Sequence, residues 1–416
     1  MKKFTIPWMA WYGDGQATFA VPDSWELAIA KMPDVEDIGD AGIEKAFGNP
    51  IGSARLRDLA SRRSKVAIAI DDIARPTKAD RLVPIILKDL EDAGIQRENV
   101  KIVMALGAHR AMHRLDLIKK LGENIYHTVD VHQHNPFENL VNLGVSSRGT
   151  PIHINRLFWE SDLKIGVGCI IPHAYAGYSG GAKIVLPGLS GIDTLEKNHL
   201  PVVTGTTCGV GLVDGHEGRE DIEEIGRKVG LDVIVNVVVN YRRDIAGCFV
   251  GDPVDAHRAG VQFAKSAYRT PVPEEPVDVV ILNAFPKDTD LIQCEDAFNI
   301  LLSSKREIIK KSGTIILIGA CIEGAGWHFL RGVGNRLYGK WDADPFMARF
   351  LRGKKLYVFS PYLSHGDAAQ YLTLDSEKKN AIFTRSWDSL IDELAVEHRE
   401  CSVLVFPTGP LQIADN

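Results

Sequence analysis

The sequence lacks the features that mark secreted, membrane or nucleic-acid-binding proteins. Its six cysteines are scattered and none forms a C-x-x-C pair, which is typical of free thiols in a reducing compartment. No run approaches the roughly 20 apolar residues of a membrane helix, and no signal-peptide pattern opens the chain. The net charge is −6 without a long basic run, which argues against nucleic acid or an anionic membrane as partner. We therefore expect a cytoplasmic protein.

The bulk composition predicts an ordinary globular protein with two domains. Hydrophobic residues make up 45% and charged residues 25% of the 416 positions, and this length suits two domains better than one. The stretch RTPVPEEPVD (269–278) reads as a linker because of its prolines and glutamates. We place an N-terminal catalytic domain at residues 1–270 and a C-terminal domain at 271–416.

Short apolar runs alternate with amphipathic helical runs through most of the chain. These runs are apolar on both faces, which predicts two α/β domains with mainly parallel sheets. The opening stretch predicts a β-hairpin that turns at Gly13–Gly15. In the first domain the expected strands are 66–70, 101–106, 163–170 and 232–240, with helices at 78–94, 114–122 and 219–230.

Chemically reactive side chains follow three of these strands. In open α/β sheets, ligands bind beyond the carboxyl ends of the strands, so residues released there are expected to meet. The first strand is followed by DDIARPT, the second by GAHR and the third by IPHAYAGYSGGAK. The candidates are Asp71, Asp72, Arg75, Thr77, His109, Arg110, His173, Ser179 and Lys183.

Each candidate also has a purely structural interpretation. Asp72 would serve equally well as the N-cap of the next helix, and Arg75 as a surface ion-pair partner. His109 and His113 have the spacing of a metal pair on a helix, although a solvated face is the better expectation for His113. The remaining histidines, including the polar HQH stretch and His328, show no informative context.

The stretch 172–191, PHAYAGYSGGAKIVLPGLSG, ends its glycine run in a lysine. A magnesium–triphosphate loop needs Gly before that lysine and Ser or Thr after it, but Ala182 and Ile184 stand there. The glycines still suit a monophosphate, and Lys183 still suits a covalent link to a ligand. A plain turn with Lys183 in solvent is the alternative. His199, near the expected end of the following helix, is by itself a capping or surface histidine.

Together, DDIARPT, GAHR, PHAYAGYSGGAK and the histidine of NHL resemble the nickel-dependent lactate racemase family of 2-hydroxyacid racemases and epimerases. The resemblance extends over nearly the whole chain. It includes PKDTDLIQCEDAF (286–298), which is similar to the family's substrate-side motif. The Pro-His-x-x-x-Gly-Tyr-Ser-Gly-Gly-x-Lys string is much more specific than a single glycine motif.

The resemblance implies a nickel-pincer nucleotide, Ni(II)-pyridinium-3,5-bisthiocarboxylate mononucleotide. Lys183 would hold one arm of it as a thioamide, and His199 would be the fourth nickel ligand. The pincer would supply the other three ligands of the planar arrangement that nickel favours. The remaining cofactor contacts would come from the DDIAR segment and the glycine-rich turn: Asp72, Arg75, Ser179, Gly180 and Gly181.

The same resemblance implies two acid/base histidines. His109 and His173 would exchange the hydroxyl proton of a 2-hydroxy acid while its C2 hydride moves to the pincer, through a planar 2-keto acid. Histidine suits both directions because its ordinary pKa lies near neutrality. Arg75 would bind the substrate carboxylate and Gln293 would add a hydrogen bond from the second domain. The active site would then lie in the cleft between the domains.

One position departs from the family pattern. Lactate-type members carry a lysine three residues after the substrate-side glutamine, whereas Asp296 stands there in this chain. A carboxylate on the substrate side repels an anionic substrate unless the substrate offers hydroxyl donors or the acid points away. We therefore expect a larger or more hydroxylated acid than lactate, such as an aldonic acid epimerised at C2.

Two other functional classes are alternatives to a 2-hydroxyacid racemase or epimerase. The first is a non-catalytic nucleotide- or sugar-acid-binding protein on the same scaffold, and the second is a phosphate-transfer enzyme. The presence of His109, His173, Lys183 and His199 disfavours the first, and the failed triphosphate loop disfavours the second. The racemase reading also implies partner proteins that synthesise the cofactor. The oligomeric state stays open.

Overall fold

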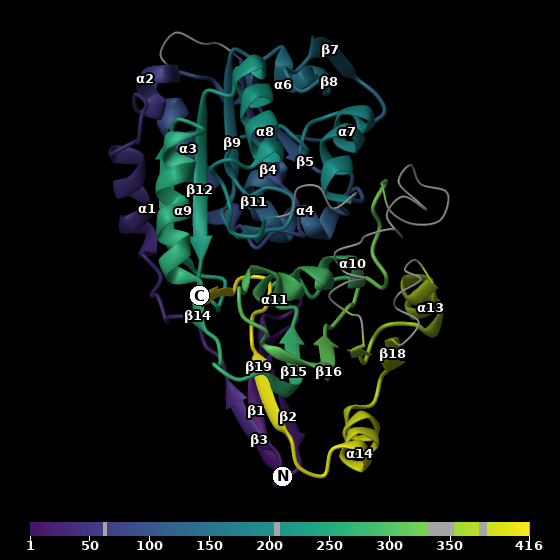
Figure 1. The fold of residues 1–416 in the computed structure, drawn as a ribbon. Coiled ribbons are helices and arrows are strands. Elements are labelled where there is room, and N and C mark those ends of the chain that lie inside the picture. The colour runs from purple at the N-terminus through teal and green to yellow at the C-terminus, as the bar shows by residue number, and fades with distance from the viewer. Residues whose placement is uncertain (61–64, 204–208, 331–350, 352, 374–380, 416) are drawn as a thin grey trace.

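The computed structural model describes residues 1–60, 65–203, 209–330, 351, 353–373 and 381–415. Its strands build two six-stranded sheets, one in each half of the molecule, and helices cover both sheets (Figure 1). The predicted mixed α/β class with mainly parallel sheets is confirmed.

The first sheet contains all four strands expected for the N-terminal half. Its order is β13 (Ile245–Gly251), β12 (Val233–Val239), β9 (Leu163–Cys169), β4 (Val66–Asp71), β5 (Val100–Ala105) and β6 (Asp130–Gln133). Every neighbouring pair is parallel except β12 with β13. Because β4, β5 and β9 are adjacent and parallel, the segments that follow them emerge at one edge.

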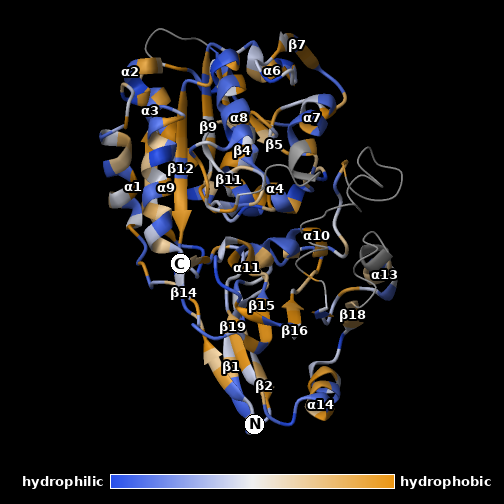
Figure 2. Cartoon of the chain, viewed as in Figure 1, coloured by the Kyte–Doolittle hydropathy of each residue, from blue (hydrophilic) through white to orange (hydrophobic). Residues whose placement is uncertain are grey.

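Helices cover both faces of this sheet, and the strands send alternate side chains to the two covering layers. Ile68 and Ile70 pack on one layer, whereas Ala67 and Ala69 face the other. Figure 2 shows orange strands between helices that are blue on their outer faces. The first layer contains α1 (Gly39–Gly48), α2 (Leu56–Ala60), α3 (Ala79–Asp92), α4 (Arg114–Leu121), α5 (Glu123–Thr128) and α9 (Asp255–Ala267); the second contains α6 (Arg156–Trp159) and α8 (Glu217–Val229).

The second sheet is parallel throughout and includes a strand from the start of the chain. Its order is β18 (Ala381–Thr384), β17 (Lys355–Phe359), β16 (Ile309–Ile318), β15 (Val277–Asn283), β19 (Ser402–Phe406) and β3 (Glu26–Ile29). The predicted hairpin is confirmed: β1 (Lys2–Trp8) pairs with β2 (Gly15–Val21). It packs on α14 (Trp387–Glu397) and lies with the second half (Figure 1). Within its described residues, this half also contains α10 (Leu291–Cys294), η3 (Glu295–Phe298), α11 (Asn299–Ser303) and α13 (His365–Thr373).

The expected domain boundary near residue 270 remains a prediction. The linker begins as β14 (Arg269–Pro271), which pairs with β20 (Ile413–Asp415) near the end of the chain. The first thirty residues belong spatially to the second half, which sequence reasoning did not anticipate. The cause is a contact of long sequence separation: β3 extends the sheet beside β19.

The cysteines and the helices agree with the expectations from composition. The five described cysteines are free thiols, four of them buried and Cys248 partly exposed, while Cys208 lies outside the described residues. In the described ranges, no helix is long and apolar enough to cross a membrane.

Candidate active site

One pocket lies at the carboxyl ends of β4, β5 and β9. It has about 1090 Å³ of space, counted out to its open mouth. The second half of the chain contributes α10, η3 and His328 to its wall. The eleven site residues that the family resemblance implies all line it: Asp72, Arg75, His109, His173, Ser179, Gly180, Gly181, Lys183, His199, Gln293 and Asp296. Of the other candidates, Asp71 lines it too, whereas Thr77 and Arg110 do not. The chemical roles of these residues remain predictions.

His109 lies between a carboxylate and an amide. Its Nδ1 is 2.5 Å from Asp72 Oδ2, and its Nε2 is 3.4 Å from Gln293 Nε2. Arg75 Nη1 donates to Gln293 Oε1 at 3.1 Å, which turns the amide nitrogen toward His109. Since the carboxylate accepts a hydrogen bond, Nδ1 carries the proton and Nε2 keeps its lone pair. His109 is therefore arranged as a proton acceptor.

Asp72 is a buried partner of His109 and does not cap a helix. The next helix begins at Ala79 with Lys78 as its N-cap, so the capping interpretation is wrong. Burial alone would raise the pKa of Asp72, but the adjacent His109 holds this pKa below its ordinary value. The surface ion-pair interpretation of Arg75 is also wrong, because its guanidinium reaches the second half of the chain.

Lys120 of α4 supports the loop that carries Asp72 and Arg75. Its fully buried Nζ donates to Asp72 O at 2.8 Å and to Arg75 O at 3.0 Å, and lies 2.7 Å from Asp71 Oδ1. Sequence reasoning missed this residue. The available signal was its position three residues after Leu117, on the face of the helix that is buried.

The glycine-rich loop folds back over the strand that precedes it. A Cβ at Gly166 would lie 2.7 Å from Ile184, and one at Gly168 would lie 3.2 Å from the Asp71 carboxylate. Gly166 of β9 therefore permits the close approach of η2 (Gly181–Ile184) to the sheet, whereas Gly168 leaves room for the Asp71 carboxylate. As a result Lys183 is 8% exposed, and the interpretation of a lysine in solvent is wrong.

Lys183 and His173 form a hydrogen-bonded pair inside this loop. Lys183 Nζ lies 2.9 Å from His173 Nε2, and the Tyr175 backbone N–H donates to His173 Nδ1 at 3.1 Å. Burial lowers the pKa of Lys183 well below its ordinary value, and the nearby Arg75 lowers it further. Burial and the neighbouring Lys183 likewise lower the pKa of His173. Both side chains are thus held toward their neutral forms.

The polar groups of the glycine-rich turn are largely used within the protein. Ser179 Oγ donates to Cys169 O at 2.6 Å and accepts from the Ile171 N–H at 3.0 Å. The Gly181 N–H donates to Asn236 Oδ1 at 2.6 Å. The hydroxyl of Ser179 therefore shapes the loop, and any contact of this residue with a ligand would involve its other atoms.

His199 presents a neutral imidazole to the pocket from the interior of α7 (Ile192–Val203), where a position near the helix end was expected. Its Nδ1 lies 2.9 Å from Leu195 O, so Nδ1 donates and Nε2 keeps the lone pair. Burial, followed by the charge of Lys183, lowers the pKa of His199 to about 3. The expected alternative of a capping or surface role is wrong, since the side chain is 7% exposed.

No metal site is built from side chains alone in the part of the chain that the structure describes, where no three His, Cys, Asp or Glu residues are grouped to hold an ion. The His109–His113 spacing does not form a helical pair, because His113 is the N-cap of α4 and is exposed, as expected. A metal at His199 would need further ligands from a bound molecule.

Asp296 is neutralised by a neighbouring lysine. Lys287 Nζ forms an ion pair with Asp296 Oδ2, and the two side chains are 2% and 26% exposed. Burial and the charge of Arg75 lower the pKa of Lys287. The pairing removes most of the repulsion that an isolated carboxylate would exert on an anionic substrate.

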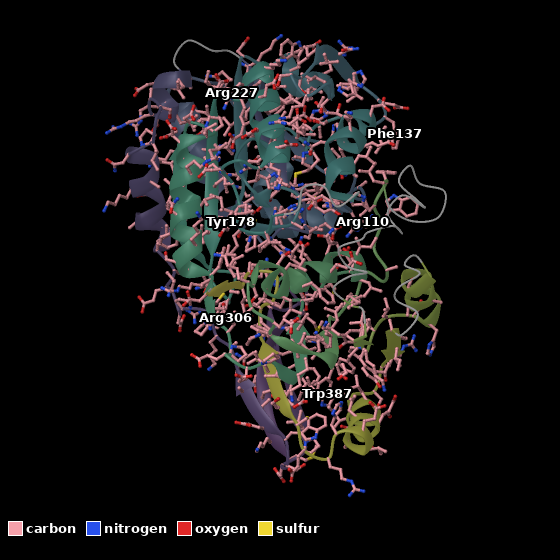
Figure 3. The ribbon with its side chains drawn as sticks, in the orientation of Figure 1. Arg110, Phe137, Tyr178, Arg227, Arg306 and Trp387 are labelled. Atoms are coloured by element: carbon pink, nitrogen blue, oxygen red, sulfur yellow. The ribbon has the colours of Figure 1, made fainter. Side chains whose placement is uncertain are left out.

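His328 also lines the pocket, although its local sequence gave no sign of this. Its ring centroid lies 5.4 Å from that of His109, and the two residues form a backbone bridge. Next to His109, Arg110 donates to Glu323 at 2.6 Å, which adds another contact between the halves; Figure 3 labels Arg110 near this boundary.

Comparison with known proteins finds relatives among the lactate racemases. The model of the lactate racemase N-terminal domain matches residues 12–209. A lactate racemase of Thermoanaerobacterium thermosaccharolyticum is 28% identical over 347 residues, covering 80% of this chain and 78% of the relative. The lactate racemase of Lactiplantibacillus plantarum is 29% identical over 287 residues, covering 68% of this chain and 66% of the relative. These similarities support membership of the lactate racemase family.

Solved structures share the fold of this chain. The lactate racemase apoprotein of T. thermosaccharolyticum superposes with a TM-score of 0.78, at 24% identity and full coverage of both chains. A Thermotoga maritima protein superposes with a TM-score of 0.66 at 16% identity, covering 87% of this chain and 97% of that one. At these identities the superpositions show the shared fold.

The first prediction concerns Lys120. Replacing it in Lys120→Met leaves the Asp71 carboxylate without its buried partner, so the free energy of unfolding should fall by about 3–5 kcal/mol. Urea denaturation measures this change. The matched control is Lys119→Met, which removes only a cation–π contact with Tyr12 and should cost less than about 1 kcal/mol. Equal losses in the two variants would contradict the role of Lys120.

Proposed function

We propose that the protein inverts C2 of a 2-hydroxy acid with the help of a nickel-pincer nucleotide. The observation that carries this proposal is the meeting of two histidines, His109 and His173, in one pocket with Arg75, Lys183 and His199. Membership of the lactate racemase family supports a racemase acting on a 2-hydroxy acid. The cofactor, the substrate and the individual roles go beyond that support.

The chain's own residues would bind and deprotonate the substrate. Arg75 offers forked donors to the carboxylate once Gln293 releases it. His109 accepts the hydroxyl proton at Nε2, and Asp72 stabilises the resulting imidazolium. Loss of that proton and of the C2 hydride leaves a planar 2-keto acid, and inversion requires a proton exchanger for each face. His173 is the second exchanger.

The pocket residues fit the cofactor. Lys183 is a buried amine held toward its neutral, nucleophilic form, which suits a covalent tether. His199 offers a neutral Nε2 lone pair, which suits one ligand position on nickel. The positive charges of Arg75 and Lys287 suit the phosphate of a mononucleotide. When bound, the cofactor would supply an acceptor and donor for the C2 hydride. Proteins that synthesise the cofactor would be needed for activation.

Asp296 and Lys287 favour a hydroxylated substrate over lactate. Their ion pair places an acceptor and a donor beside each other at the wall formed by the second half. Neighbouring hydroxyl groups of an aldonic acid would satisfy both, whereas the methyl group of lactate would satisfy neither. Approach of the two halves around the substrate would exclude water and retain the keto acid.

The second prediction concerns the substrate profile of cofactor-loaded protein. Inversion at C2 should be faster for gluconate than for lactate, malate or 2-hydroxyglutarate, by at least ~10-fold in kcat/KM. Asp296→Lys should shift the preference toward lactate, and Asp214→Lys, at a site whose side chain is 85% exposed, is the control that should leave it unchanged. If lactate is the best substrate of the unaltered protein, the aldonic-acid assignment is wrong; inversion of none of the four acids would overturn the proposed function.

The third prediction separates metal binding from proton transfer. Protein made in cells that synthesise the cofactor should carry about one nickel per chain and a mass adduct on Lys183. His199→Ala should lose most of the nickel, while His109→Ala should keep it and lose ~10²–10⁴-fold in kcat. His132→Ala, at a residue with a 40% exposed side chain, serves as the control. Metal analysis and intact mass measure these outcomes. Full nickel retention by His199→Ala would contradict its role as a ligand.

A further inference from the structure

The hydrogen bonds around His173 fix which of its nitrogens carries the proton. The Tyr175 backbone N–H can only donate, so His173 Nδ1 accepts and has a lone pair. A neutral imidazole has one accepting and one donating nitrogen, so Nε2 carries the proton. Lys183 Nζ lies 2.9 Å from that Nε2–H and must accept from it. Lys183 is therefore a neutral amine whose lone pair is already engaged.

His109 has the opposite arrangement. Its Nδ1–H donates to Asp72, and its Nε2 lone pair faces the amide nitrogen of Gln293. The Arg75 hydrogen bond to Gln293 Oε1 excludes the flipped amide. Without a bound ligand, His109 thus presents a basic nitrogen 3.4 Å from the Gln293 amide nitrogen. Both nitrogens of the other histidine, His173, form hydrogen bonds with residues of its own loop.

The surroundings of Lys183 agree with a neutral amine. Both Lys183 and His173 are buried, at 8% and 7% exposure, in a pocket that also holds Arg75 and Lys287. An additional positive charge there would lack water and face two like charges. The same crowding lowers the pKa of Lys183 well below its ordinary value, burial being the largest cause.

We propose that the unmodified Lys183 amine prevents His173 from exchanging a proton with the substrate, because it holds the Nε2–H of His173 in a hydrogen bond. Acylation of Lys183 removes this hydrogen bond. The biological acylation rests on the proposed function. The amine lone pair forms an N–C bond to the thiocarboxylate carbon of the cofactor, and the C–O bond breaks. The oxygen takes one proton from the amine and one from solvent, and leaves as water. No electrons are gained or lost. The product nitrogen keeps one hydrogen, and its lone pair is delocalised into the thiocarbonyl group.

Acylation therefore reverses the hydrogen-bonding character of Lys183 Nζ. An amide-type N–H donates and does not accept, so it opposes the Nε2–H of His173. The imidazole loses its partner and becomes free to turn Nε2 toward the pocket. Loading of the cofactor and readiness of the second histidine are thereby coupled, and only a loaded chain has two working histidines.

The first test uses the apoprotein labelled with 15N in its histidine side chains. Two-bond 1H–15N spectra at neutral pH distinguish the tautomers, and His173→Gln and His109→Gln assign the two signals by their disappearance. The expected result is an Nε2–H tautomer for His173 and an Nδ1–H tautomer for His109. An Nδ1–H tautomer or an imidazolium at His173 would overturn the proposal.

The second test replaces Lys183 with genetically encoded Nε-acetyl-lysine and uses no cofactor. The rate at which diethyl pyrocarbonate modifies His173, read by peptide mass, should rise roughly tenfold over the unmodified apoprotein because one hydrogen bond is lost. His109 is the internal control, and its rate should stay constant. An unchanged rate at His173 would contradict the release. Neither test measures racemisation. Both tests can therefore fail while the proposed function holds, and both can succeed while the proposed function fails.

Discussion

Burial of Lys183 in a pocket that it shares with other basic side chains governs the chemistry of this site. Arg75, Lys183 and Lys287 all line the pocket, and burial, followed by the charge of Arg75, lowers the pKa of both lysines. Asp72 is paired with His109, which leaves Asp296 as the partner of Lys287. The resulting positive field suits an anionic acid and a nucleotide phosphate, and it makes an amine available as a nucleophile.

This crowding depends on how the glycine-rich loop packs on β9. Because position 166 has no Cβ, η2 approaches the sheet closely, and Lys183 is buried. The carbonyl oxygens of Ser179 and Gly180 accept hydrogen bonds from the side chains of His257 and Arg219. The loop is therefore held on both sides, which fixes Lys183 against His173. A buried amine held in this way can act as a tether without being a surface charge.

The strand pattern was enough to predict the sheet and the polar residues that follow β4, β5 and β9, because parallel strands release their following segments at one edge. His199, Gln293 and Asp296 were expected only from the family resemblance. The predictions failed where contacts of long sequence separation decide the outcome. His328 reaches His109 across 219 positions of sequence, and β3 joins the second sheet next to β19. Local sequence around Lys120 likewise does not indicate that its ammonium group supports the loop 71–75.

The central claim is that C2 is inverted by transfer and return of its own hydride. It is tested most directly with cofactor-loaded protein and a single enantiomer of substrate that carries deuterium at C2, in ordinary water. The account predicts that the product of opposite configuration retains the deuterium, because the bound keto acid receives the same hydride on its other face. Replacement of the deuterium by solvent hydrogen would mean that C2 is deprotonated, and it would contradict the account.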